Sequence, residues 1–149
     1  TWDELGGKTM KRRDFWETEH PLGLTGLAGW SLAVTDLDAA SDFMQSFLGA
    51  RVVYETERQA IGARAIGLAV ADDVVELLAP TGEGALSRHH NRFGDGIRAT
   101  RIGARDLGAV HDWFTAKGIK LGPGDVEGSL ALPEAANLGL IFEFVEVAD

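Results

Sequence analysis

The sequence predicts an α+β fold built from two copies of a βαβββ module. Residues 29–37 (GWSLAVTDL) align with residues 99–107 (ATRIGARDL), seventy positions later. In each copy an apolar run is followed by Asp-Leu and then by a helical pattern that ends at a glycine. Each half also closes with a strand-like segment that carries one glutamate, Glu76 or Glu143. A duplicated unit with one carboxylate per copy implies pseudo-two-fold symmetry and a shared site at which both carboxylates meet.

The first module is expected over residues 27–80, after an N-terminal arm or linker over residues 1–26. Trp30, Leu32 and Val34 alternate with small residues, which is the periodicity of a strand. Asp36 is a candidate N-cap for a helix whose apolar positions are Leu37, Ala40, Met44, Phe47 and Leu48. Gly49 ends this helix, and the remaining strands of the module are expected at 51–57, 61–70 and 74–79.

A connector over residues 81–96, with a short helix near 85–91, leads into a second module over residues 97–149. This module opens with a strand over 97–104, and Asp106 is expected to cap a helix that ends at Gly118. Its remaining strands are expected at 119–121, 129–132 and 140–147.

Composition and charge exclude several classes of function. A chain of 149 residues with 45% hydrophobic and 25% charged residues fits one globular domain. The net charge of −9 argues against nucleic acid and anionic membranes as partners, because phosphate binding needs clustered Lys and Arg. The absence of cysteine excludes disulfides, thiolate metal sites and cysteine nucleophiles. No apolar run approaches the roughly 18 residues of a membrane span, and we expect a cytoplasmic protein.

Two βαβββ modules with Asp-Leu after the first strand, together with the run Glu76-Leu-Leu-Ala-Pro80, resemble the vicinal oxygen chelate superfamily. This superfamily includes glyoxalases, bleomycin-resistance proteins and extradiol dioxygenases. The chain is most similar to its methylmalonyl-CoA epimerase-like branch or to the C-terminal half of a four-module member. The resemblance implies a cupped, mixed eight-stranded sheet with the helices on the outside.

The resemblance also implies a degenerate metal site. In metal-dependent relatives, two ligands come from the first strands of the modules and two from the last strands. Glu76 and Glu143 match the last-strand positions, whereas the first-strand positions fall on Gly29 and Ala99, which have no donor side chain. The catalytic carboxylate of the epimerase branch would fall near Ala65, where the sequence has no acid.

Strand alternation predicts the lining of the cup. If Gly29 and Ala99 face the cavity, so do the following residues: Ser31, Ala33, Ala63, Ala65, Gly67, Ala69, Arg101 and Gly103. A wall of small residues predicts a large cavity, which is a natural ligand site. Arg101 is the exception, and we hypothesise that its guanidinium replaces the metal cation by pairing with one or both glutamates.

From these observations we expect a metal-independent small-molecule binding domain with ligand contacts from Arg101, Glu76, Glu143 and Ser31. No cofactor is expected, although a divalent metal is left open, and its ligands would be Glu76 and Glu143. The alternative is a metal-dependent isomerase, lyase or dioxygenase that uses these two glutamates with donors from elsewhere. The expected partners are a small organic molecule and either a second copy of the chain, in a homodimer, or a neighbouring domain of a larger protein.

Overall fold

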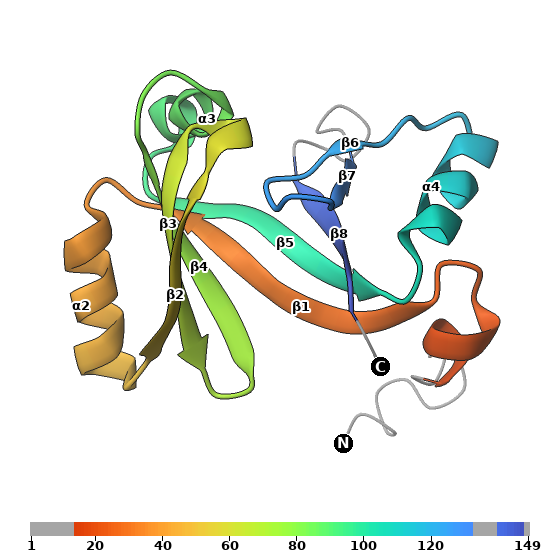
Figure 1. Cartoon of the computed structure of the whole chain (residues 1–149), viewed down its shortest axis with the longest axis horizontal. Coiled ribbons are helices and arrows are strands. Elements are labelled where there is room, and N and C mark those ends of the chain that lie inside the picture. The colour runs from red at the N-terminus through yellow and green to blue at the C-terminus, as the bar shows by residue number, and fades with distance from the viewer. Residues whose placement is uncertain (1–13, 133–139, 148–149) are drawn as a thin grey trace.

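The computed structural model describes residues 14–132 and 140–147, which fold around one mixed sheet. Within these residues the sheet has eight strands in the order β2-β3-β4-β1-β5-β8-β7-β6. The elements of the first half are η1 (Phe15–Glu19), β1 (Leu24–Ala33), α2 (Leu37–Leu48), β2 (Arg51–Arg58), η2 (Gln59–Ile61), β3 (Ala63–Val70) and β4 (Asp73–Pro80). Those of the second half are α3 (Ala85–Phe93), β5 (Gly96–Ala104), α4 (Leu107–Ala116), β6 (Gly122–Pro123), β7 (Leu130–Leu132) and β8 (Phe142–Glu146). This is the predicted α+β architecture, with α2, β2, β3 and β4 on the left of Figure 1 and α4, β6, β7 and β8 on the right.

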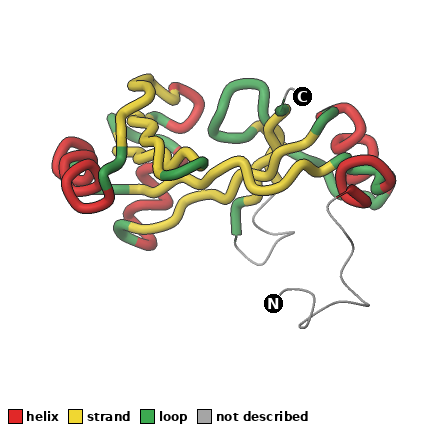
Figure 2. The backbone as a smooth tube through the Cα atoms, turned by 90° about the horizontal axis from the view of Figure 1, so that it is seen from below, coloured by secondary structure: helices red, strands yellow, loops and turns green. Residues whose placement is uncertain are grey.

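The repeat is visible in the pairing of the strands. β1 pairs in parallel with β4 and β5 pairs in parallel with β8, so that Ser31 lies beside Glu76 and Arg101 beside Glu143. β1 and β5 pair antiparallel with each other, and they therefore join the two modules within one chain. Figure 2 shows these strands running through the middle of the molecule, with helices at both ends. The pairing brings the matching positions of both modules to the centre of one sheet.

The two repeated helices begin where the sequence predicts. The Asp36 side chain accepts a hydrogen bond from the backbone N–H of Ala39, and Asp106 accepts from those of Gly108 and Ala109. These bonds satisfy backbone donors that have no partner inside the first turn of a helix. α2 ends at Gly49, whose φ of 66° is in the left-handed region that favours glycine.

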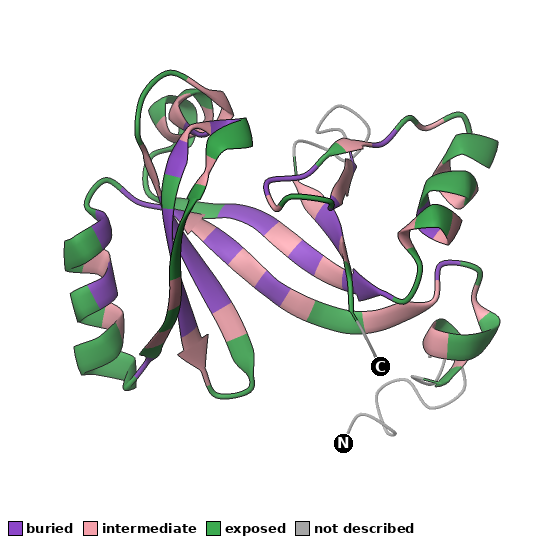
Figure 3. Ribbon diagram, in the orientation of Figure 1, coloured by how far each residue is buried: buried purple, intermediate pink, exposed green. Residues whose placement is uncertain are grey.

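Each helix covers the outer face of its own half of the sheet. Alternation along the strands buries Ile66, Leu68 and Leu77 beneath α2, and a second cluster with Val110 and Phe144 lies beneath α4. Figure 3 shows this alternation as changing colours along β1 and β5. The alternation predicted for Trp30, Leu32 and Val34 is confirmed: these residues, with Ile66, Leu68 and Val70, belong to the cluster beneath α2 or pack against it.

Some boundaries and faces differ from the expectation. β1 begins at Leu24, before the first clearly alternating residue, and β6 is Gly122–Pro123 rather than residues 119–121. Ile119 and Leu121 instead pack into the core beneath α4. Phe47 is 71% exposed and Leu48 50% exposed, because the part of α2 that contacts the sheet presents Leu37, Ala40 and Met44.

The inner face of the sheet is less open than its small residues suggest. α3 lies over one end of this face, where the fully buried Leu86 packs with Ala33, Ala63 and Ala65. Beside Gly67, the space that a side chain would take is filled by the Tyr54 ring. The expectation of an open wall along the whole of β3 is therefore wrong, since other parts of the chain cover these positions.

In the described residues, no helix is long and apolar enough to cross a membrane.

Candidate functional site

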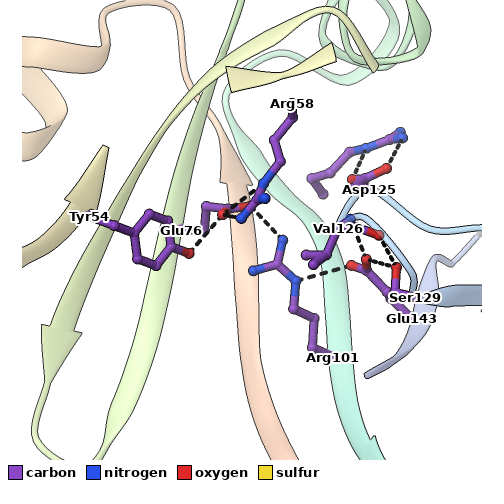
Figure 4. A network of polar contacts seen from close by, with 9 residues as sticks. Tyr54, Arg58, Glu76, Arg101, Asp125, Val126, Ser129 and Glu143 are labelled. Carbon is purple, nitrogen blue, oxygen red and sulfur yellow. Dashed lines mark hydrogen bonds and ion pairs between the residues drawn. The ribbon is translucent and has the colours of Figure 1, made fainter. Parts of the chain in front are cut away.

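Arg101 lies between Glu76 and Glu143 at the centre of the sheet (Figure 4). Its Nη2 donates to Glu76 Oε1 at 2.5 Å, and its Nε donates to Glu143 Oε2 at 3.0 Å. Both glutamates are fully buried, and Arg101 is 6% exposed. A guanidinium has a planar array of donors, so it can bridge two carboxylates that approach from different directions. The pairing proposed from the sequence is thus present with both glutamates.

Glu76 has two further partners, both from β2. Tyr54 Oη donates to Glu76 Oε2 at 2.7 Å, and Arg58 donates to the same oxygen from Nη2 at 2.6 Å and from Nε at 3.2 Å. β2 lies next to β3, and its Tyr54 side chain reaches across Gly67 because glycine leaves room for the ring. A methyl group at Gly67 would overlap that ring.

Glu143 is held by the loop between β6 and β7, residues 124–129. Its Oε1 accepts from the Ser129 hydroxyl at 2.5 Å and from the backbone N–H of Val126 at 2.7 Å. Gly124 lets this loop approach closely, since a Cβ there would meet both Ser129 Oγ and Glu143 Oε1. Each of the four oxygens of the two glutamates therefore accepts at least one hydrogen bond.

A second buried ion pair fixes the same loop. Arg98 donates from Nε and Nη2 to the two carboxylate oxygens of Asp125, each at 3.1 Å, and both side chains are 6% exposed. Arg98 comes from a point in β5 where the register with β1 shifts between Ser31 and Leu32. This irregularity lets Arg98 leave the alternation of the strand and reach the 124–129 loop.

The electrostatics of the cluster favour the charged forms of Glu76 and Arg101 and the neutral form of Tyr54. Burial alone would raise the pKa of Glu76, but the hydrogen bonds from Arg58, Arg101 and Tyr54 and the charge of Arg101 lower it overall. Burial alone would lower the pKa of Arg101, but the charges and hydrogen bonds of Glu76 and Glu143 raise it. The pKa of Tyr54 is raised to about 12, first by burial and then by its hydrogen bond to Glu76.

Ser31 shares the inner face but makes no side-chain hydrogen bond to this network. Its hydroxyl is fully buried, and it is the one buried side-chain oxygen or nitrogen without a hydrogen-bond partner among the residues that the structure describes. It lies between Glu76 on β4 and Ala99 on β5, at the position of the first module that corresponds to Arg101 in the second. The expected ligand contact from Ser31 stays a prediction.

The residues present do not fit the divalent metal that the resemblance implies. Gly29 has a φ of +123°, and a Cβ there would overlap the Val74 carbonyl oxygen, so this position has no room for a donor side chain. Ala99 is buried and has no donor. Glu76 and Glu143 already bind a guanidinium between them. In the described ranges no three His, Asp or Glu side chains are grouped as a metal site requires.

Two cavities meet above the network. One, of about 710 Å³, is lined by residues 56–60 and 123–128, and the other, of about 560 Å³, includes Tyr54, Val74, Arg101 and Val145 in its lining. Their linings share Thr56, Arg58 and Val126, so the two cavities are neighbours, and we call them together the cleft between β2 and the 124–129 loop. The open space lies over the arginines rather than along the small residues of β3.

The partners that surround the three central residues were not predicted from the sequence. Tyr54, Thr56 and Arg58 alternate along β2, and this spacing could have placed Tyr54 and Arg58 on the inner face. Nothing comparable marks Val126, because its contribution is a backbone N–H in an irregular loop.

Comparisons with known proteins agree with this fold. The structure resembles methylmalonyl-CoA epimerase from Mycobacterium tuberculosis, with 27% identity, 85% of this chain and 90% of that chain covered, and a TM-score of 0.77. It also resembles the Streptomyces coelicolor methylmalonyl-CoA epimerase in complex with 2-nitronate-propionyl-CoA (24% identity, 85% and 99% covered, TM-score 0.73). The hypothetical protein BH1468 from Bacillus halodurans C-125 has a similar fold (21% identity, 83% and 94% covered, TM-score 0.73).

A sequence search of curated proteins found no match. The family description that matches is Glyoxalase/Bleomycin resistance protein/Dioxygenase superfamily, over residues 25–129. This range spans β1 to β6, which are six of the eight strands in the described sheet. It includes the neighbouring strands β1 and β5, through which the two modules are joined. The chain therefore belongs to the Glyoxalase/Bleomycin resistance protein/Dioxygenase superfamily.

Proposed function

We propose that this chain is a metal-independent small-molecule binding domain, in which the Arg101 guanidinium stands where metal-dependent members of the superfamily hold a cation. The observation that carries this proposal is the pair of bonds from Arg101 to Glu76 and Glu143. Two carboxylates in a buried site need a compensating positive charge, and Arg101 supplies it from within the chain. A metal ion would have to displace the Arg101 guanidinium, which is a side chain of the same protein.

The charge balance of the cluster supports the same conclusion. Glu76 and Glu143 carry two negative charges, and Arg58 and Arg101 carry two positive charges. The four charges cancel without an external ion. The oxygens that a divalent ion would use also accept hydrogen bonds already, since Tyr54, Ser129 and the Val126 backbone donate to them beside the two arginines.

The cleft above the network is the proposed binding site. Its wall over Arg101 includes Ala28, Val74, Val126 and Val145, which suit an apolar molecular body. The part toward η2 and the 124–129 loop is more polar and carries Glu57 and Glu127. This acidic edge disfavours a ligand with several phosphates, so we expect a compact organic molecule rather than the coenzyme A esters bound by similar structures.

The first test is calorimetric titration of the purified protein with Mn²⁺, Co²⁺ and Zn²⁺, beside a Glu76→Gln variant. The proposal predicts no saturable binding that depends on Glu76. One equivalent of any of these ions, lost in Glu76→Gln, would contradict it and favour the metal-dependent enzyme.

A second measurement uses the substrate named for similar structures, methylmalonyl-CoA. Ala65, at the position where the epimerase branch carries its carboxylate, is fully buried beneath α3 and provides no base. We expect no exchange of the methylmalonyl α-proton with deuterated solvent, with or without added Co²⁺. Exchange above the rate of a heat-denatured control would overturn the assignment as a binding domain.

A further inference from the structure

We propose that the outward N–H groups of Arg101 and Arg58 form the recognition site for a hydrogen-bond-accepting oxygen of the ligand. The ligand class is a compact, mostly apolar molecule with a carbonyl or carboxylate head group. This inference rests on the proposed function, because it concerns the molecule that occupies the same cleft.

The argument starts from the hydrogen bonds that Arg101 makes. A guanidinium has five N–H donors on three nitrogens. Nε and Nη2 of Arg101 bind the two glutamates, and Nη1 has no partner in the described part of the chain. In Figure 4 no bond is drawn to this third nitrogen. Among the described residues that are not exposed, Ser31 Oγ is the one polar side-chain atom that is fully buried and has no hydrogen-bond partner. Because Nη1 of Arg101 also has no partner, it is not fully buried.

Arg58 adds a second set of donors to the same floor. Its Nε and Nη2 both bind Glu76 Oε2, which leaves Nη1 unpaired among the described residues. The Arg58 side chain is 17% exposed and lines both cavities. Two cationic side chains, Arg58 and Arg101, therefore line the cleft.

The floor of the cleft offers donors but few acceptors. Glu76 and Glu143 are fully buried and their oxygens are occupied, so no free carboxylate oxygen reaches the ligand from them. Glu55, at the edge of the cleft, pairs with Arg64 on β3. A ligand head group that accepts hydrogen bonds can satisfy the arginine donors, whereas one that only donates leaves them unpaired and adds repulsion if it is positively charged.

The test uses three probes of the same shape with different head groups: benzamide, benzoate and benzamidine. Benzamide presents a neutral carbonyl and benzoate a carboxylate, whereas benzamidine presents only donors and a positive charge. Binding is followed by NMR, through the arginine side-chain ¹⁵N–H resonances and the valine methyl resonances. We expect saturable shifts at Arg101 and at Val145 with benzamide or benzoate and none with benzamidine. Failure of both acceptor probes, or equal binding of benzamidine, would overturn the proposal.

Two variants identify the site of binding. Arg101→Lys keeps the positive charge but removes the planar set of donors, and it should abolish the shifts caused by benzamide and benzoate. Because this variant also disturbs the buried pair, Val145→Phe serves as the second, since it fills the cavity and leaves all four charged side chains in place. Val145→Phe should weaken binding of the acceptor probes about tenfold or more, and unchanged affinity would contradict the proposed location.

Metal binding in the calorimetric test would refute the proposed function itself, whereas failed probe binding without metal binding refutes only this inference.

Discussion

Replacement of Arg101 by methionine is the most informative perturbation of the buried network. Methionine keeps much of the length of the side chain but removes both bonds to the glutamates. Breaking a buried ion pair by removing one partner costs about 3–5 kcal/mol. Glu76 keeps Tyr54 and Arg58, and Glu143 keeps two donors from the 124–129 loop, so neither carboxylate is fully orphaned. We therefore expect a loss of about 3 kcal/mol, the lower end of that range.

This loss should depend on pH in a defined direction. The pKa of Glu76 is lowered in the folded protein, so its ionised form contributes stability above the usual pKa of glutamate, and this contribution is lost as the pH falls through the lowered value. In Arg101→Met a large part of that contribution is missing at neutral pH. The difference between the two proteins is expected to be largest near about pH 7 and to shrink as the pH falls below about 4.

The assay is urea unfolding at several pH values, followed by the fluorescence of the four tryptophans. Arg64→Met is the matched control, because Arg64 also pairs with carboxylates but its side chain is 46% exposed. The control should change stability by less than about 0.5 kcal/mol. A loss below about 1 kcal/mol in Arg101→Met, or a loss that does not vary with pH, would refute the view that Arg101 compensates the buried carboxylates.

Three further predictions concern residues around the two glutamates. Tyr54 is the one tyrosine in the sequence, so the ultraviolet absorbance of tyrosinate should titrate with a pKa of about 12. The contribution of Tyr54 to stability is complete below the ordinary pKa of 10 and is lost as the pH rises through 12. Titration near 10, in protein shown by circular dichroism to be folded, would contradict the bond to Glu76. Gly124→Ala should lower the free energy of unfolding by about 2 kcal/mol in urea, because the added methyl group overlaps Ser129 and Glu143; unchanged stability would mean that the loop does not approach so closely. Arg98→Met should speed amide hydrogen exchange in residues 124–129 more than in α2, and uniform exchange would show that the Arg98 pair does not hold this loop.

The repeat made the fold and the centre of the site predictable. Each Asp-Leu pair fixes the start of a helix, and the spacing of seventy residues places Ser31 and Arg101 at equivalent positions. Alternation along the strand then puts Arg101 on the face of Glu143, which is the register that the structure shows. Local periodicity is sufficient where a residue and its partner both lie in regular strands.

The same reasoning could not find what covers the site. The small residues of β3 predicted open space, but a single sequence gives no information on which distant side chain fills it. Here Leu86 covers Ala65 and the Tyr54 ring covers Gly67. Arg98 was also missed, because a shift in register turns it toward Asp125 against the simple alternation.

The central claim is that a guanidinium takes the place of a metal ion between Glu76 and Glu143. The most direct measurement is a crystal structure of the protein grown with excess Mn²⁺, with an anomalous difference map at the site. Our account predicts Arg101 bonded to both glutamates and no anomalous peak between them. A Mn²⁺ peak coordinated by the two carboxylates, with Arg101 turned away, would contradict it.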